Sequence, residues 1–179
     1  NRKQNDTLSM ELYSKAYELG AVTGFTASGN KFTFDCNHAK VQVDFCRDDI
    51  FRLLMSYNGE FTNPAGNDIV INPPVVNPKV TVKEMDGYYL MSTGKVALRA
   101  YKNPLRFAMY KADNTTLVWE ETKGLTYGKE TVQYLKRGAN EYFYGGGMQN
   151  GRFSHRDKTI LMRIDWNWED GGAPNPAPF

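Results

Sequence analysis

The sequence predicts an all-β protein, an antiparallel β-sandwich built by a chain of domain size. From Gly24 onward, short runs rich in β-branched and aromatic residues alternate between apolar and polar positions. Turn-forming pairs such as Asp86-Gly87 and Thr93-Gly94 separate these runs. Helical patterns do not alternate with the runs, so two packed antiparallel sheets are expected rather than a doubly wound parallel sheet.

The length and composition agree with one soluble globular domain. The chain has 179 residues, of which 41% are hydrophobic and 23% are charged. At this length about 70% of the surface of the unfolded chain can be buried, so no disulfide, metal ion or cofactor is needed for stability. The formal net charge of +2, without a long run of like charges, argues against nucleic-acid binding. Since no apolar run approaches about 18 residues, no membrane partner is expected, and the compartment stays open between cytoplasmic and secreted.

The beginning of the chain has an ambiguous pattern. Leu8 and Leu12 recur at the spacing of a helix, which could run over Thr7–Leu19. Tyr13 and Tyr17 fit a strand nearly as well. Both interpretations stay open for this segment.

The next strands are predicted to form a hairpin. After the turn Ser28-Gly29-Asn30, the strand Lys31–Asp35 places Phe32 and Phe34 on one face, and Val41–Phe45 follows with the same period of two. Further strands are expected at Ile50–Ser56, Lys79–Met85, Tyr88–Met91, Lys95–Tyr101, Leu105–Tyr110, Thr116–Glu120, Glu130–Lys136 and Thr159–Asp165. The stretch Asn63–Pro78 holds four of the eight prolines and is expected to form a long loop around a short strand, Ile69–Ile71.

Cysteine and histidine do not form a recognisable metal or catalytic cluster. Cys36 and Cys46 follow no zinc or redox spacing, so free, packed thiols are expected, the alternative being a bridge between neighbouring strands. His38 lies beside a turn and is expected to be solvated. His155 stands in a glycine-rich stretch and is expected to have a structural hydrogen-bonding role. No metal site is predicted.

Acidic residues close to tryptophan are the candidates for sugar binding. The adjacent pair Glu120-Glu121 would point to opposite faces of a strand, and both carboxylates are expected to be solvated. Glu169 and Asp170 have different neighbours. Trp166 and Trp168 come just before them, and such rings stack on a sugar face while carboxylates accept hydrogen bonds from its hydroxyls. These four residues are therefore predicted to bind substrate, the alternative being a structural loop.

A run of three glycines follows an aromatic segment. Gly145, Gly146 and Gly147 come after Tyr142–Tyr144, and they allow a backbone path that is closed to residues with a Cβ atom. No Gly-Lys-Ser/Thr sequence follows, so a phosphate-binding loop is excluded. A special turn and a plain loop both fit this composition.

Several motifs in the last forty residues occur in a characteristic order. Two earlier segments, Asp48–Arg52 and Tyr101–Phe107, show a weaker similarity to the same family pattern. Together they resemble the N-terminal domain of glycoside hydrolase family 31, and the likeness covers most of 22–179. The specific motifs are Tyr142–Met148, Arg156-Asp157-Lys158, Asn167–Asp170 and Pro178-Phe179.

This resemblance implies a galactose-mutarotase-like β-sandwich. It implies the sandwich at 22–165 and, at 166–179, a loop and connection toward a catalytic (β/α)8 barrel, whereas residues 1–21 lie outside the likeness and form a segment of uncertain structure. In this family the aspartate nucleophile and the aspartate acid/base lie in the barrel, so no catalytic residue is assigned to this chain and the fragment alone is expected to be inactive. The glycine turn would then lie near the active site of the parent enzyme, a retaining α-glycosidase or α-glycosyltransferase.

The resemblance also implies a substrate contact. The acidic residue of the family's Asn-x-Asp loop binds the sugar on the leaving-group side, which points to Glu169 or Asp170, with Trp168 or Trp166 as stacking neighbours. The present loop has one residue more than the family pattern, so either carboxylate could face the sugar. The implied partners are an α-linked oligosaccharide or polysaccharide and the barrel itself. Gly146 and Met148 differ from the residues of many family members, which points to a subgroup that acts on an unusual α-glucan or α-galactoside-type linkage.

Two other functions share this architecture. A sugar mutarotase needs a histidine acid and a glutamate base in the sandwich cleft, and neither His38 nor His155 has such a partner in the pattern. A stand-alone carbohydrate-binding or structural module suits the aromatic fraction of 13%. The proline-rich end, which has no closing strand, favours the family 31 interpretation over such a module.

Overall fold

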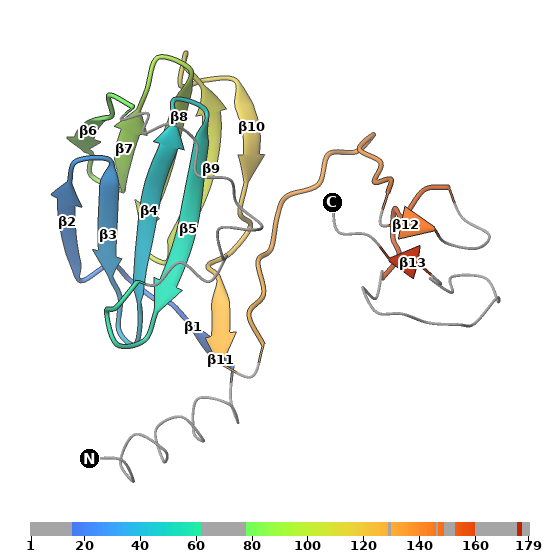
Figure 1. Cartoon of the computed structure of the whole chain (residues 1–179), viewed down its shortest axis with the longest axis horizontal. Coiled ribbons are helices and arrows are strands. Elements are labelled where there is room, and N and C mark those ends of the chain that lie inside the picture. Colours follow the sequence, from blue (N-terminus) through green and yellow to red (C-terminus); the bar gives the residue numbers. More distant parts are fainter. Residues whose placement is uncertain are drawn as a thin grey trace, which may run out of the picture. The chain divides into compact units, whose positions relative to one another are not determined.

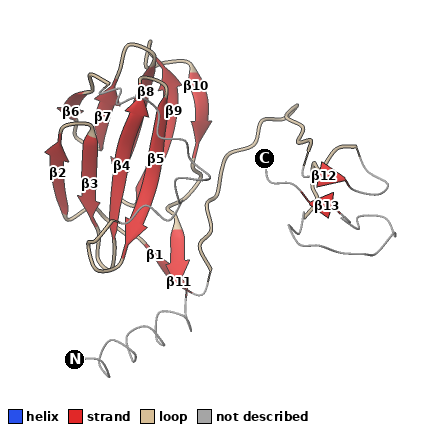
Figure 2. Ribbon diagram, viewed as in Figure 1, coloured by secondary structure: helices blue, strands red, loops and turns tan. Residues whose placement is uncertain are grey.

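All regular elements in the described part of the chain are strands, as the sequence predicts (Figures 1 and 2). The computed structural model describes residues 16–61, 78–128, 130–145, 147–148, 153–159 and 175–176. The chain divides into two compact units, Asn1–Lys136 and Arg137–Phe179, which are described separately below. Among the described residues, no helix is long and apolar enough to span a membrane.

Four antiparallel strands form the first sheet of the larger unit. The predicted hairpin is confirmed, with Phe34 opposite Val41 and Phe32 opposite Val43. The hairpin extends on both sides, so the sheet order is β2-β3-β4-β5 (Figure 1). The strands are β2 (Gly24–Ser28), β3 (Lys31–Asp35), β4 (Lys40–Arg47) and β5 (Ile50–Ser56).

Five antiparallel strands form the second sheet as a simple meander. The order β10-β9-β8-β7-β6 follows the chain, because short turns join each strand to the next. The register shifts between Leu117 and Trp119, so the edge strand has a bulge. The strands are β6 (Thr81–Glu84), β7 (Tyr88–Ser92), β8 (Val96–Lys102), β9 (Leu105–Lys111) and β10 (Leu117–Glu120).

A separate two-stranded ladder settles one ambiguity of the sequence. Strand β1 (Ala16–Glu18) pairs with β11 (Thr126–Gly128), so the strand interpretation is correct at these residues. The rings of Tyr17 and Tyr127 stack with centroids 5.7 Å apart, and this contact favours the paired strand. Leu19 follows the strand as a buried core residue, and the part of this segment before Ala16 lies outside the described residues.

The expected strand at Glu130–Lys136 is wrong as a regular element. The described residues there make isolated bridges, Thr126 with Val132 and Glu121 with Leu135. Residues 122–125, which lie between Glu121 and Thr126, are not in a strand, so the two bridges do not form a continuous ladder. The expected strands at Ile69–Ile71 and Thr159–Asp165 lie outside the described residues, apart from Thr159.

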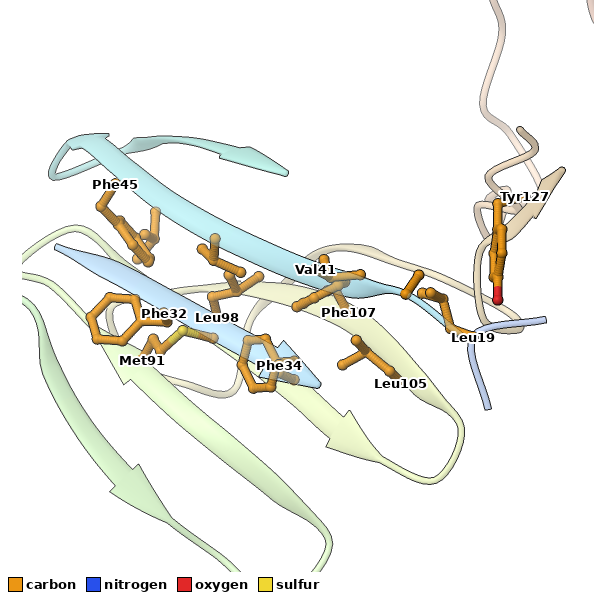
Figure 3. Close-up of a cluster of buried hydrophobic side chains, with 14 residues drawn as sticks. Leu19, Phe32, Phe34, Val41, Phe45, Met91, Leu98, Leu105, Phe107 and Tyr127 are labelled. Atoms are coloured by element: carbon orange, nitrogen blue, oxygen red, sulfur yellow. The ribbon is translucent and has the colours of Figure 1, made fainter. Parts of the chain in front are cut away.

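The core lies between the two sheets. Alternate residues of β3 and β4 point inward, and they meet inward residues of β7, β8 and β9 (Figure 3). Phe34 and Phe107 make an edge-to-face contact across the sheets, with ring centroids 6.0 Å apart. The buried side chains shared between the sheets include Phe32, Phe34, Val41, Val43, Phe45, Met91, Leu98, Ala100, Leu105 and Phe107. This packing makes the larger unit a β-sandwich.

The cysteine and turn-histidine predictions are confirmed. Cys36 and Cys46 are free thiols. Burial, with a smaller effect of the Asp35 charge, raises the pKa of Cys36 to about 11, so this thiol is poorly reactive near neutral pH. His38 is exposed in a bend.

Replacing Tyr127 by phenylalanine is expected to stabilise the protein. The Tyr127 ring is fully buried, and its hydroxyl has no hydrogen-bond partner among the described residues. Burial also raises its pKa to about 12. Removal of an unsatisfied hydroxyl should raise the free energy of unfolding by about 1 kcal/mol in urea titrations. Tyr57→Phe, at a ring that is 47% exposed, is the control and should change the free energy of unfolding by less than about 0.5 kcal/mol. A loss of stability in Tyr127→Phe would contradict this expectation.

Candidate functional site

The predicted sugar-contacting residues fall outside the described part of the chain. Trp166, Trp168, Glu169 and Asp170 are among these, and so is Gly146, so their roles stay predictions. The smaller unit is described at 137–145, 147–148, 153–159 and 175–176, which includes the other two glycines of the turn.

The aromatic segment before the glycines is anchored along one edge. The backbone N–H of His155 donates to the carbonyl of Phe143 at 2.8 Å. The Nε2 atom of His155 lies 2.9 Å from the carbonyl oxygen of Gly145. One residue further, the guanidinium of Arg156 donates to the carbonyl of Glu141. Since carbonyls at alternate residues face the same side, the segment is extended.

His155 has the structural role that the sequence predicts. It is 7% exposed, and its backbone and its ring both bind the aromatic segment. Gly145, which receives the ring contact, has a φ angle of +94°, a conformation that side chains with a Cβ atom rarely adopt. Gly145 thus has a backbone conformation of the kind that the sequence analysis expected the glycines to allow.

An ion pair between Arg137 and Asp157 lies beside these hydrogen bonds in the sequence. Arg137 binds the carboxylate of Asp157, and the hydrogen bond from Arg137 lowers the pKa of Asp157 below its usual range. The Arg156 guanidinium also lies over the Tyr142 ring, 5.4 Å from its centroid. Glu141 accepts a hydrogen bond at its Oε2 atom from the Gly138 N–H at 2.8 Å. Among the described residues of this unit, Arg156 and Glu141 thus hold backbone groups of the same unit.

A short ladder brings the end of the chain back to the glycine turn. Strand β12 (Gly147–Met148) pairs antiparallel with β13 (Asn175–Pro176). The chain between these strands, 149–174, contains all four residues predicted to bind sugar. Both ends of that connection are therefore tied to the turn that the sequence analysis singled out.

Glu121 is a buried carboxylate that the sequence analysis did not identify. It was expected to be solvated at a strand end, and this is wrong, because Glu121 is only 1% exposed. Its Oε2 atom accepts from the Phe107 backbone N–H at 2.7 Å, and its Oε1 atom accepts from the Gln133 amide at 2.7 Å. Burial raises its pKa, whereas the hydrogen bonds from Gln133 and Phe107 and the charge of Arg106 oppose that rise. No local pattern distinguishes Glu121 from Glu120, whose carboxylate binds Lys136.

An apolar cavity of about 430 Å³ lies at one end of the sandwich in the larger unit. Val41, Leu53 and Phe107 line it from both sheets, and Glu60 and Thr131 are its polar lining residues. A sugar site needs several convergent polar groups, so this lining suits apolar packing better than a hydroxyl-rich ligand.

The described residues contain no cluster of three or more His, Cys, Asp or Glu side chains able to hold a metal ion.

Comparison with protein families gives a match over most of the chain. The model described as "Glycosyl hydrolase 31 N-terminal galactose mutarotase-like domain" matches residues 40–178. The match begins at the first residue of β4 and reaches past the β12–β13 ladder. It therefore covers most of the sandwich and the smaller unit.

Curated relatives are much longer than this chain. Alpha-glucosidase 2 of Bacillus thermoamyloliquefaciens is 27% identical over 161 residues, which are 89% of this chain and 20% of that protein. The isomaltosyltransferase of Sporosarcina globispora is 24% identical over 133 residues, which are 68% of this chain and 11% of that protein. The chain thus spans about a fifth and about a tenth of these two relatives.

Solved structures with the same fold include two enzymes. A GH31 dextranase from Flavobacterium johnsoniae, in complex with glucose, superposes with a TM-score of 0.69 at 23% identity, covering 79% of this chain and 18% of that one. The cycloalternan-forming enzyme from Listeria monocytogenes, in complex with a pentasaccharide substrate, has a TM-score of 0.63 at 20% identity, covering 82% of this chain and 14% of that one. At these identities the likeness shows the fold alone, and the fold agrees with the predicted galactose-mutarotase-like sandwich.

Proposed function

The chain belongs to the family of glycosyl hydrolase 31 N-terminal galactose mutarotase-like domains, and from this membership we propose that it is the N-terminal β-sandwich of a retaining α-glycosidase or α-glycosyltransferase. The proposed substrates of the parent enzyme are α-linked oligosaccharides or polysaccharides. The family match over residues 40–178 carries this proposal. The two curated relatives, an alpha-glucosidase and an isomaltosyltransferase, support the α-glycoside class.

The proposed role of this chain is to supply a substrate-contacting loop. Retention of configuration requires two carboxylates about 5–5.5 Å apart, one as nucleophile and one as acid/base, and both are assigned to the catalytic barrel of the parent. Asp170 or Glu169 would accept hydrogen bonds from the sugar on the leaving-group side, and Trp168 or Trp166 would stack on its apolar face. The β12–β13 ladder supports this role, because it ties both ends of the connection that carries these residues.

Asp170→Ala in the full-length parent tests the loop assignment. Loss of a charge-assisted hydrogen bond should lower kcat/KM on an α-linked oligosaccharide by about 10- to 100-fold. An aryl α-glycoside has no leaving-group sugar, so its kcat/KM should change much less. Glu169→Ala is the matched variant, and the larger selective loss identifies the carboxylate that faces the sugar. Equal losses on both substrates in both variants would contradict the proposed contact.

The gene sequence downstream of Phe179 tests the proposal that the parent protein contains a catalytic barrel. An open frame that continues with alternating strand and helix patterns and two well-separated aspartates would support the enzyme proposal. A stop codon at that point would leave a stand-alone module. Titration with α-linked oligosaccharides would then decide between a carbohydrate-binding and a structural domain.

A further inference from the structure

His155 contacts the part of the smaller unit whose backbone has the greatest conformational freedom. Gly145, Gly146 and Gly147 follow one another in the sequence, and glycine loses more conformational freedom on folding than any other residue. Gly145 has a φ angle of +94°, which is one of several conformations that glycine adopts at little cost. Contacts from outside the glycine run must therefore select the path of the chain at this point.

The ring of His155 makes such a contact at the first glycine. Its Nε2 atom lies 2.9 Å from the carbonyl oxygen of Gly145. A carbonyl oxygen only accepts hydrogen bonds, so Nε2 carries a proton and donates to it. The backbone of His155 is held separately, because its N–H donates to the Phe143 carbonyl at 2.8 Å and its carbonyl accepts from the Lys158 N–H at 3.1 Å. Loss of the ring donor should therefore release Gly145 and leave these two backbone hydrogen bonds in place.

The same ring shortens the connection between β12 and β13. Gly147-Met148 pairs with Asn175-Pro176, so this ladder ties both ends of 149–174 (Figure 1). His155 lies within the connection, and its ring and its backbone N–H tie it back to the segment before β12. The residues predicted to bind sugar follow in 156–174, between His155 and β13. A shorter span between two fixed points has less conformational freedom to lose when a ligand binds.

We propose that His155 is a positioning residue for substrate binding by the parent enzyme, and that it acts through the Gly145 carbonyl instead of touching the sugar. This inference rests on the proposed function, because the substrate contact that it supports is the one proposed for Asp170 or Glu169. His155 is only 7% exposed, so it has little surface with which to meet a ligand itself. Misplacement of a group by about 1 Å can cost about 100-fold in rate, so one anchoring hydrogen bond can have a large effect.

His155→Leu and His155→Gln in the full-length parent test this role. Leucine removes the donor, so KM for an α-linked oligosaccharide should rise about tenfold while kcat changes less than about twofold. Glutamine has an amide N–H that can reach the Gly145 carbonyl, so His155→Gln should restore KM to within about threefold of the native value. An aryl α-glycoside has no leaving-group sugar, and its KM should change less than about threefold in both variants.

Hydrogen exchange measures the turn itself, without the reaction. Exchange in a peptide that spans 144–148 should accelerate about tenfold in His155→Leu and much less in His155→Gln. If His155→Leu does not fold, His155→Asn replaces it, because its amide is one carbon shorter and does not reach the Gly145 carbonyl. Phe34→Leu is the control for a general loss of stability, since Phe34 belongs to the core of the larger unit.

Three outcomes would overturn the proposal. An unchanged KM in His155→Leu would show that the anchor does not affect substrate binding. Equal effects in His155→Leu and His155→Gln would show that the N–H donor is not what matters. A rise in KM that is as large in Phe34→Leu would show a general loosening of the protein. When Asp170→Ala or Glu169→Ala is selective and His155→Leu is not, only this inference fails, whereas the proposed function fails when neither carboxylate variant is selective.

Discussion

Phe34→Ala should lower the free energy of unfolding by about 3–5 kcal/mol, because it removes a fully buried ring and leaves a cavity. Phe34 is 0% exposed and contacts rings from both sheets. Its centroid lies 5.1 Å from that of Phe25 in β2, 5.8 Å from Tyr89 in β7 and 6.0 Å from Phe107 in β9. Urea titration of the isolated chain, followed by far-UV circular dichroism, measures the change.

Two variants make the Phe34 measurement specific. Phe34→Leu keeps most of the apolar volume and should cost clearly less than Phe34→Ala. Ile50→Ala removes an apolar side chain that is 49% exposed on the same sheet, and it should cost less than about 1 kcal/mol. A similar loss in Phe34→Ala and Ile50→Ala would mean that the contact between the sheets does not stabilise the sandwich.

Glu121→Ala should lower the free energy of unfolding by about 3 kcal/mol, because it leaves the buried N–H of Phe107 without its acceptor and removes the hydrogen bond from the Gln133 amide. The donors are the backbone N–H of Phe107 and the side-chain amide of Gln133. Glu121→Gln should cost less, since the Gln133 amide can turn its oxygen toward the new amide group. Hydrogen exchange at the amide of Lys136, which donates to the Glu120 carbonyl at 2.8 Å, should accelerate in Glu121→Ala more than in Glu121→Gln.

The pH dependence of Glu121 has a definite sign. Burial raises its pKa above the usual 4.5, so the folded state holds the proton more tightly than the unfolded state does. The stability that this preference contributes is fully present below the unfolded pKa and is lost as the pH rises through the folded pKa. The free energy of unfolding of the native protein minus that of Glu121→Gln should therefore fall as the pH rises above 4.5, and then level off. A difference that grows with pH would contradict the raised pKa.

The strands of the sandwich could be predicted because their signal is local. Phe32 and Phe34 alternate with polar residues, and a period of two directs both rings to one face whatever they pack against. Turn pairs such as Asp86-Gly87 mark strand ends by their own backbone preferences. The family resemblance depends on short motifs of the same kind. The residues predicted to bind sugar belong to these motifs.

The sequence by itself determined the fold class, the inward faces of the central strands, the free thiols and the family. Only the tertiary structure decided that Ala16–Glu18 pairs with Thr126–Gly128, and that Glu121 is buried while Glu120 binds Lys136 at the surface. The physical reason is the distance along the chain. Residue type and spacing determine a strand and its two faces within a few positions, whereas pairing partners and the burial of a charge depend on segments that meet only after the chain has folded.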